Sequence, residues 1–239
     1  MNRIHLISGP RNISTALMYS FGNRKDTSIV DEPLYAYYLS THPKIDHPGK
    51  KEILESQSQS LDEVLSNVIF GSYETDNLFI KNMAHHLDGV DWSFLEALTN
   101  VFLIRSPNQL IASFAEIISN PTMLDIGIEL EYQLFQYLNE MNQKCIVLDS
   151  NEVLKDPKKV LTELCSLLDI PFDIRMLNWA SGARIEDGVW AQYWYKNVHR
   201  STGFSRQKTS DRIFPERLTS LLEKAQEYYD LLYKHSIKA

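Results

Sequence analysis

The sequence predicts an α/β fold of three layers, α/β/α, in which the central, mainly parallel sheet resembles that of P-loop nucleotide-binding proteins. Short apolar runs alternate with helical patterns along the chain, as they do where helices cover both faces of a parallel sheet. The first apolar run leads through a tight loop directly into a helix, an arrangement typical of nucleotide-binding α/β proteins. The 239 residues suit one domain with a sizeable core, so we expect residues 1–239 to form a single unit.

Composition excludes several classes of protein. With 24 Lys and Arg against 31 Asp and Glu, the net charge of −7 offers no general basic face for nucleic acid. The two cysteines, Cys145 and Cys165, are too few for a disulfide framework or a cysteine-rich metal site, and we expect buried, unreactive thiols. No run approaches a membrane span, and Met1–Arg11 lacks the apolar stretch of a signal peptide. These features predict a soluble, cytoplasmic protein.

Five short apolar runs, each bounded by turn residues, predict buried strands. In chain order they are Ile4–Ile7, Ser28–Val30, Leu78–Ile80, Val101–Ile104 and Cys145–Leu148. Apolar residues at helical spacing predict helices over Leu61–Ile69 and from Pro107, Pro157 and Pro215 onward. Pro107 and Pro157 suit first helical positions, and we expect Ser106 and Asp156 to cap those two helices.

Two stretches fit no regular element. Ser40–Glu55 holds two prolines, a glycine and three lysines, and it reads as a loop or lid. Ser181–Arg212 is longer and rich in aromatic residues, and long stretches of this kind in compact domains are usually functional or disordered. The aromatic residues within Trp190–Tyr195 favour an ordered segment. We expect both stretches to wall a ligand pocket.

The loop after the first predicted strand has the features of an anion site. Free amides and the positive end of a helix dipole converge where Ala16–Phe21 begins to form a helix. Arg11 adds a positive charge, and Ser14 and Thr15 add hydroxyls. A nucleotide-hydrolysing P-loop would need glycine and lysine in place of Ser14 and Thr15, which counts against an ATPase or kinase. An ordinary strand-to-helix turn is the alternative interpretation.

A second candidate for phosphate binding follows the fourth predicted strand. Arg105 stands at the carboxyl end of that strand, where α/β sheets bind ligands, and Ser113 lies eight positions further along, on the next helix. An arginine and a serine so arranged can hold one phosphate from two sides. The alternative is a surface arginine beside a solvent-facing serine.

With these two motifs the chain resembles the sulfotransferases that use 3′-phosphoadenosine 5′-phosphosulfate (PAPS). Pro10–Thr15 is similar to the family's phosphosulfate loop, Pro-Lys-Ser-Gly-Thr-Thr, with Arg11 at the lysine and Ile13 at the glycine. Arg105 and Ser113 resemble the family's 3′-phosphate motif. The resemblance implies a sulfotransferase-like fold that needs no metal. It implies PAPS-binding roles for Arg11, Asn12, Ser14, Thr15, Arg105 and Ser113.

The resemblance extends toward the C-terminal end. Val198–Phe204 lies where the family's C-terminal loop closes on the 3′-phosphate, although the family's Arg-Lys-Gly pattern is not kept. From this segment the resemblance implies contacts to the nucleotide by Ser201, Thr202 and Gly203.

Sulfuryl transfer requires a base, fixed positive charge and aligned reactants. Asp31 and Glu32 end the second predicted strand, and several sulfotransferase branches have a Glu-Pro here whose glutamate is the general base. Glu32 is therefore our first candidate for the base. Alternatively, Glu32 is a carboxylate that the positive end of a helix dipole stabilises, and Asp31 is a helix cap.

A second set of candidates follows the third predicted strand. Lys81 matches the lysine of a Lys-x-His motif in the cytosolic branch, where it steadies the leaving group, but Met83 stands at the histidine's position. This departure favours Glu32 as the base, while His85 or His86 could still reach the site. We expect His5 to be structural, and His42 and His47 to be solvated beside the lid.

Together these observations predict transfer of a sulfuryl group from PAPS to a hydroxyl or amine of a small-molecule acceptor. A protein that binds 3′-phosphoadenosine without catalysis is one alternative, and an ATP-dependent phosphotransferase is another. The identity of the acceptor and the oligomeric state are left open.

Overall fold

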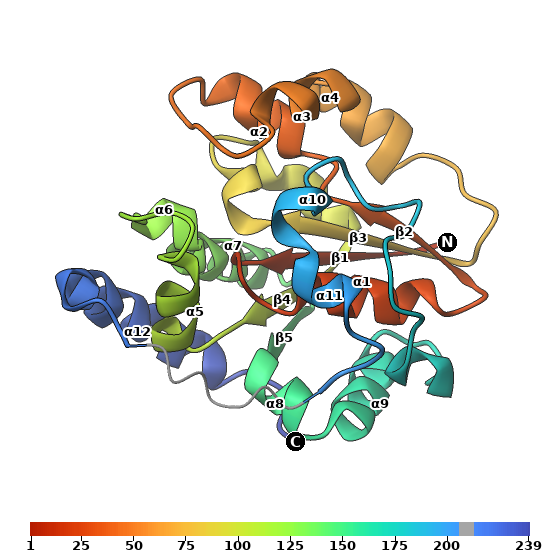
Figure 1. The fold of residues 1–239 in the computed structure, drawn as a ribbon. Helices are drawn as coiled ribbons and strands as arrows, with labels where there is room; N and C mark the ends of the chain where they lie inside the picture. The colour runs from red at the N-terminus through yellow and green to blue at the C-terminus, as the bar shows by residue number, and fades with distance from the viewer. Residues whose placement is uncertain (206–212) are drawn as a thin grey trace.

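A computed structural model describes residues 1–205 and 213–239. It contains one five-stranded sheet in the order β2-β3-β1-β4-β5, with every neighbouring pair parallel (Figure 1). The strands are β1 (Asn2–Ser8), β2 (Thr27–Asp31), β3 (Asn77–Met83), β4 (Thr99–Ile104) and β5 (Cys145–Asp149). Each contains one of the five predicted apolar runs, and the predicted three-layer α/β fold is confirmed.

Six helices of the described chain form the two outer layers. They are α1 (Ser14–Gly22), α5 (Pro107–Phe114), α7 (Ile128–Glu140), α8 (Ser150–Lys155), α9 (Pro157–Leu167) and α12 (Thr219–Tyr233). Short helices fill the connections: α2 (Tyr35–Thr41), α3 (Lys50–Ser56), α4 (Leu61–Val64), α6 (Met123–Ile126), α10 (Ala191–Trp194) and α11 (Lys196–His199). A π-helical turn (Leu65–Ile69) continues α4, and 3-10 turns span Ala84–Leu87, Trp92–Ala97, Ile174–Leu177 and Glu216–Leu218.

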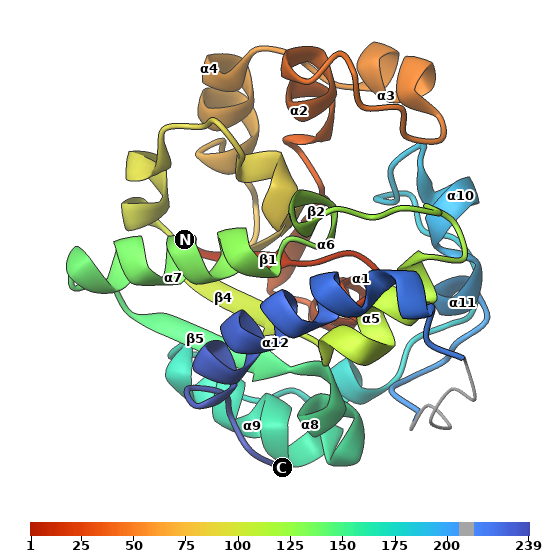
Figure 2. The same ribbon diagram turned by 90° about the vertical axis from the view of Figure 1, so that its left-hand side faces the viewer.

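Alternation along the strands divides the core between the two faces of the sheet. Ile4 and Leu6 of β1 point into one core, with α1 and α9. The side chain of Ile7, which follows Leu6, points to the opposite face of the sheet and packs into the other core, with α5, α7 and α12. Figure 2 shows α7 and α12 side by side across that second face. A third, smaller cluster packs α2 and α3 against α10 beyond the ends of β2 and β3.

The predicted loop and closing segment are more regular than expected. Lys50–Ser56 forms helix α3 inside the predicted lid, because Ile53 is fully buried among α2 and α10 and holds this turn in place. Residues 181–205 include α10 and α11, while residues 206–212 of the predicted closing segment lie outside the described part of the chain.

Helix capping is confirmed at one of the two predicted positions. Asp156 accepts a hydrogen bond from the Lys159 amide at the start of α9, at 3.0 Å. Ser106 occupies the cap position of α5, but no side-chain capping bond forms there. Pro107 supplies no amide hydrogen, which leaves one fewer donor for a cap to satisfy.

The cysteines behave as inert thiols. Cys165 is buried, whereas Cys145 is only half-buried at the start of β5. Burial raises the pKa of both thiols to about 11, so they remain protonated at neutral pH. Within the described residues, the helices are too short or too polar to cross a bilayer.

Candidate functional site

The loop between β1 and α1 is held in one conformation by its own sequence. A side chain at Gly9 would come within 2.6 Å of the Ile126 carbonyl oxygen, so this position requires glycine. Arg11 adopts a left-handed φ of 55°. The Asn12 side chain donates to the Leu103 carbonyl of β4 at 2.6 Å and accepts from the Ile13 amide at 3.0 Å. Asn12 therefore anchors the loop to the sheet just before α1 begins.

The two predicted anion-binding motifs meet in space. Arg11 Nε donates to the Ser113 hydroxyl at 3.1 Å, and Arg105 donates to the Arg11 carbonyl oxygen. Because β1 and β4 are parallel neighbours, the loop after β1 and the residue after β4 reach the same edge of the sheet. Arg105 and Ser113 are both buried, which excludes the surface interpretation of the second motif.

A cavity of about 540 Å³ opens beside these motifs. Most of the predicted nucleotide-binding residues line it: Arg11, Asn12, Thr15, Arg105, Ser113, Ser201 and Gly203. Thr202 is exposed and lies outside this lining, because its backbone pairs with the Trp179 amide and its side chain faces away. The amides at the start of α1 have no partner within the helix, so they add a positive end to a wall that already holds two guanidinium groups.

A second, smaller cavity of about 100 Å³ lies against the same loop. Arg11, Asn12, Thr15, Trp194 and Tyr195 line both cavities. The smaller one also contains Ser14 and all three predicted catalytic residues, Glu32, Lys81 and His85. Aromatic and apolar side chains complete its wall: Tyr35, Met83 and Phe114. The loop thus lies between a larger cavity, lined by Arg11 and Arg105, and a smaller one, where Glu32 and Lys81 also line the wall.

Four polar side chains form a buried network at the wall of the smaller cavity. Lys81 Nζ donates to Asp31 Oδ1 at 2.7 Å, to Glu32 Oε1 at 2.5 Å and to the Tyr195 hydroxyl at 2.6 Å. The register of β2 against β3 pairs Asp31 with Lys81, which explains this contact. The three hydrogens of the ammonium are therefore all engaged. Lys81 lies in the predicted place, but its donors are directed at protein carboxylates and a phenol.

Glu32 is held in an unusual backbone conformation at the end of β2. Its φ is 44°, and its amide donates to the Lys81 carbonyl at 2.7 Å. The Gln57 side chain donates to the Glu32 carbonyl at 3.2 Å. Non-glycine residues with such φ values cost free energy and cluster at functional sites. Burial raises the pKa of the Glu32 carboxyl, and the positive charge of Lys81 opposes that effect. For Lys81, burial alone would lower the pKa, but the two carboxylates outweigh it.

Asp31 does not cap a helix, since α2 begins at Tyr35, with Leu34 at its cap position. Its carboxylate accepts instead from Lys81, from the Tyr195 hydroxyl at 2.8 Å and from the Gly188 amide at 3.2 Å. Asp31 therefore ties the C-terminal segment to the end of β2.

The histidines fall into three different environments. His5 is fully buried and bonds to Asn100 at 3.2 Å, as expected of a structural residue. His85 lines the smaller cavity, and burial lowers its pKa to about 3. His86 lies behind it, with Nε2 3.8 Å from Glu32 Oε2, and burial lowers its pKa as well. A base is most effective with a pKa near the working pH, so His85 is a weaker candidate than Glu32.

The expectation that His47 is solvated is wrong. His47 is half-buried, lines the smaller cavity and lies 2.8 Å from the Tyr35 hydroxyl through Nδ1. The turn that leads into α3 folds it inward against the ring of His85. His42 stays closer to the surface, where Nε2 is 3.1 Å from an Asp88 oxygen.

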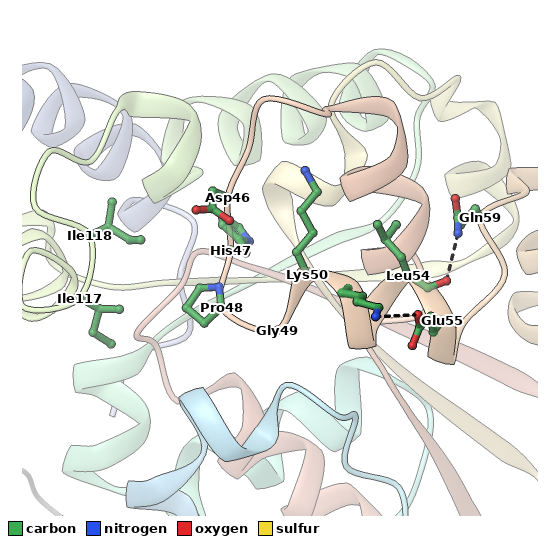
Figure 3. Close-up of a pocket in the computed structure, with 11 residues that line it drawn as sticks. Asp46, His47, Pro48, Gly49, Lys50, Leu54, Glu55, Gln59, Ile117 and Ile118 are labelled. Carbon is green, nitrogen blue, oxygen red and sulfur yellow. Dashed lines mark hydrogen bonds and ion pairs between the residues drawn. The ribbon is translucent and has the colours of Figure 1, made fainter.

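His47 also borders an outer hollow of about 850 Å³. Figure 3 shows residues 46–50 on one side of this hollow, with Ile117 and Ile118 facing them from another segment. Lys50 does not reach into the hollow as a free cation, because its ammonium donates to the Pro43 and Ile45 carbonyls at 2.8 and 2.6 Å. The predicted lid thus forms the outer border of the smaller cavity.

Tyr195 and Tyr35 are the members of the site whose roles the sequence did not assign. Tyr195 belongs to an aromatic stretch that was expected to wall the pocket. Its hydrogen bonds to Lys81 and Asp31 join residues more than a hundred positions apart in the sequence, so no local pattern indicates them. Across the described residues, His, Cys, Asp and Glu side chains form no group of three or more that could hold a metal ion.

Comparisons with known proteins add an independent finding. A family model described as a sulfotransferase domain matches residues 2–234. Two Arabidopsis thaliana proteins, named branched-chain-amino-acid aminotransferase-like proteins 1 and 2, are 38% and 34% identical over 97% and 98% of this chain. The chain spans only 42% of the length of each of these relatives.

Solved structures show the same fold at low sequence identity. The sulfotransferase domain from the curacin biosynthetic pathway has a TM-score of 0.60 at 16% identity, with 96% of this chain and 97% of that chain covered. Mouse sulfotransferase SULT7A1, complexed with PAP, has a TM-score of 0.57 at 12% identity, with 94% and 82% covered.

Proposed function

The chain belongs to the sulfotransferase domain family, and from this premise we propose that it transfers a sulfuryl group from PAPS to a hydroxyl or amine of a small molecule. One observation carries the proposal. Two anion-binding motifs converge on one cavity, and the loop that they share separates it from a smaller cavity with a buried carboxylate. Donor and acceptor would then meet across Arg11, Asn12 and Thr15.

The residues of the larger cavity fit a doubly phosphorylated nucleotide. Arg11, Thr15 and the first amides of α1 would hold the phosphosulfate end, and Ser14 would contact it from the smaller cavity. Arg105 and Ser113 would hold the 3′-phosphate, with Ser201 and Gly203 closing from the C-terminal segment. The two guanidinium groups suit a ligand of high negative charge, which the net charge of the whole chain would otherwise repel.

Bound PAPS supplies an activated sulfuryl group. Glu32 would take the proton of the acceptor while the acceptor oxygen or nitrogen forms its bond to sulfur. The bond from sulfur to the bridging phosphate oxygen breaks, and the electron pair leaves with 3′-phosphoadenosine 5′-phosphate (PAP). Arg11 and the α1 amides would balance the charge that develops on the phosphate. Lys81 would keep Glu32 in place by its 2.5 Å hydrogen bond.

The acceptor must fit a small space between aromatic side chains and neutral histidines. The matched plant proteins are named for a likeness to branched-chain amino-acid aminotransferases. Amino acids and the corresponding hydroxy acids are therefore the first acceptors that we would screen. The cytoplasmic location stays a prediction from the sequence.

A second function is favoured by one specific observation. Because all three hydrogens of Lys81 are engaged by protein groups, the site could bind PAP without turning PAPS over. An ATP-dependent phosphotransferase is less well supported, since Thr15 stands where a P-loop lysine would reach the phosphates.

Calorimetric titration of the purified protein with PAP, AMP and ATP-Mg tests the proposal. We expect PAP to bind at least about tenfold more tightly than AMP, a preference of roughly 1.4 kcal/mol for the 3′-phosphate. Equal binding of ATP-Mg without a 3′-phosphate preference would refute the nucleotide assignment. PAP binding without any PAP release from PAPS, over a panel of acceptors, would support the non-catalytic alternative.

A further inference from the structure

Tyr195 lies at the boundary of the two cavities. It stands between α10 and α11, is 5% exposed and lines both the larger and the smaller cavity. The same C-terminal segment lines the larger cavity with Asn197, Val198 and Ser201. A ligand in the larger cavity and a group in the smaller one would therefore both contact this residue or its immediate neighbours.

The Tyr195 hydroxyl has a complete set of hydrogen bonds inside the site. It accepts from Lys81 Nζ at 2.6 Å and from Trp190 Nε1 at 3.1 Å. Its own hydrogen is directed to Asp31, whose oxygens are 2.9 and 2.8 Å away, with Glu32 Oε1 at 3.2 Å. A phenol has one donor and two acceptor positions, so all are used. Its loss would leave a buried ammonium hydrogen and an indole N–H without a partner.

The segment that carries Tyr195 is fixed on the side facing α1 as well. The Tyr19 hydroxyl donates to Asp187 at 2.6 Å, and His199 Nε2 lies 3.0 Å from the same carboxylate. The Gly188 amide donates to Asp31 at 3.2 Å. These contacts bracket Tyr195 in sequence, so its hydroxyl is delivered to the network from a well-anchored stretch of chain.

We propose that Tyr195 is a positioning residue, which holds Glu32 and Lys81 in their reacting arrangement and links that arrangement to the segment lining the nucleotide cavity. The inference rests on the proposed function, because it assigns Tyr195 a role relative to Glu32 as the base. Tyr195 itself takes no proton from the acceptor. Its hydroxyl keeps the Lys81 ammonium and the two carboxylates at fixed distances from one another.

The proposal has a consequence for pH dependence. A donor close to a carboxylate favours its ionised form, so removal of the Tyr195 hydroxyl should raise the pKa of Glu32 further. The charged and titratable groups packed around Glu32 are Asp31 from β2, Tyr35 from α2, Lys81 from β3, His86 from the turn after β3 and Tyr195. Arg11, His47 and His85 line the same cavity. Except for Tyr195, all of these remain in the variant Tyr195→Phe.

The first test uses PAPS turnover, in which the sulfuryl group passes to water or to an identified acceptor, and the PAP that is released is the readout. For Tyr195→Phe we expect a kcat about 10- to 100-fold lower, PAP affinity within about twofold of the parent, and an acidic limb of the rate profile displaced to higher pH. A merely loosened fold would lower the rate without moving that limb. Tyr193→Phe is the matched control, because Tyr193 lies two positions earlier, in α10, but is 41% exposed.

The second test needs no turnover and measures urea unfolding of four proteins: the parent, Tyr195→Phe, Glu32→Gln and the double variant. A carboxyl whose pKa is raised in the folded state stabilises the fold at low pH, and this contribution is lost as pH rises through the folded pKa. We therefore expect the loss of stability caused by Tyr195→Phe to shrink on going from neutral to about pH 5. In the Glu32→Gln background that pH dependence should become smaller, because Glu32 is one of the two carboxylates that face the Tyr195 hydroxyl.

The outcomes separate the two proposals. If the parent neither binds nor consumes PAPS, the proposed function fails, and the unfolding series still decides the role of Tyr195. If Tyr195→Phe has the parent's limb and a loss of stability that is independent of pH, the role assigned to Tyr195 is wrong. If Tyr195→Phe is unfolded at neutral pH, we expect the circular dichroism of its folded state to recover at about pH 5, and the double variant to be folded at both pH values. If the signal of Tyr195→Phe does not recover, the inference is wrong.

Discussion

The two cavities beside the β1–α1 loop are built on opposite principles. The larger, of about 540 Å³, is lined by cationic and hydroxyl groups from strand ends and loops. The smaller, of about 100 Å³, is walled by neutral rings and by a carboxylate already bound to a lysine and close to a tyrosine. The first wall offers charge to a ligand, whereas the second satisfies its charges internally.

This difference teaches how one loop can serve binding and chemistry together. Positive groups near a helix N-terminus attract an anion without any need for exact proton placement. A base, in contrast, must be held at a fixed distance and in a defined protonation state. The buried network around Lys81 meets the second requirement at the expense of freedom for the lysine. Substitutions on the two sides should therefore affect different measurements.

Glu32→Gln should give the largest effect, and we expect it to change turnover and not nucleotide binding. The amide keeps the shape of the side chain but cannot accept a proton at neutral pH. We expect PAP release from PAPS to fall by about 10²- to 10⁴-fold, with PAP affinity within about twofold of the parent. Radiometric PAPS assays and calorimetry measure the two quantities. Normal turnover would remove Glu32 from the role of base.

Lys81→Met should act first on stability. It removes the ammonium that pairs with two buried carboxylates, each within 2.7 Å of it. Breaking a buried ion pair from one side costs about 3–5 kcal/mol in the free energy of unfolding. Urea denaturation measures this loss. Lys155→Met is the control, since Lys155 pairs with Glu152 at 3.7 Å on the surface, where such a pair is worth less than about 1 kcal/mol. Equal losses in the two variants would contradict the internal satisfaction of the network.

Arg105→Ala should act on the larger cavity and leave the smaller one intact. The loss of a charged donor to a phosphate should weaken PAP binding by on the order of 100-fold. AMP binding should change much less, because the 3′-phosphate is absent. Arg175→Ala serves as the control, since that arginine pairs with Asp173 on the surface. If PAP and AMP affinity fell equally, Arg105 would not read the 3′-phosphate.

The sequence was sufficient to predict the parts of the site that depend on strand order. A parallel sheet brings the loop after β1 and the residue after β4 to one edge, so Arg11, Arg105 and Ser113 were expected together and are found together. Glu32 and Lys81 follow the same logic, because β2 and β3 are neighbours in register. Both sets need only local patterns and the rule for parallel strands.

The remainder of the site depends on contacts that no local pattern encodes. The bond from Lys81 to Tyr195 is set by how the C-terminal segment folds back over β2 and β3. His47 is buried because helix α3 forms within a stretch whose prolines and lysines favour a loop. In each case tertiary packing outweighed local sequence preference. The roles of the individual residues stay predictions until the variants are measured.

The smallest of the expected effects concerns the histidine at the inner wall. Burial lowers the pKa of His85 to about 3, below its value in the unfolded chain. A group with a lowered pKa contributes stability above its unfolded pKa and loses that contribution as pH falls toward the folded one. At about pH 5 this ring alone should cost the folded protein on the order of 2 kcal/mol relative to neutral pH.

His85→Phe keeps a ring in the wall but cannot charge, so its loss of stability on acidification should be smaller by that amount. Urea unfolding at the two pH values measures the difference. The larger cavity offers no comparable group, since no histidine is found among the described residues that line it. If His85→Phe loses as much stability on acidification as the parent, water reaches the His85 ring in the smaller cavity. The contrast between a solvated larger cavity and a dry smaller cavity would then be wrong.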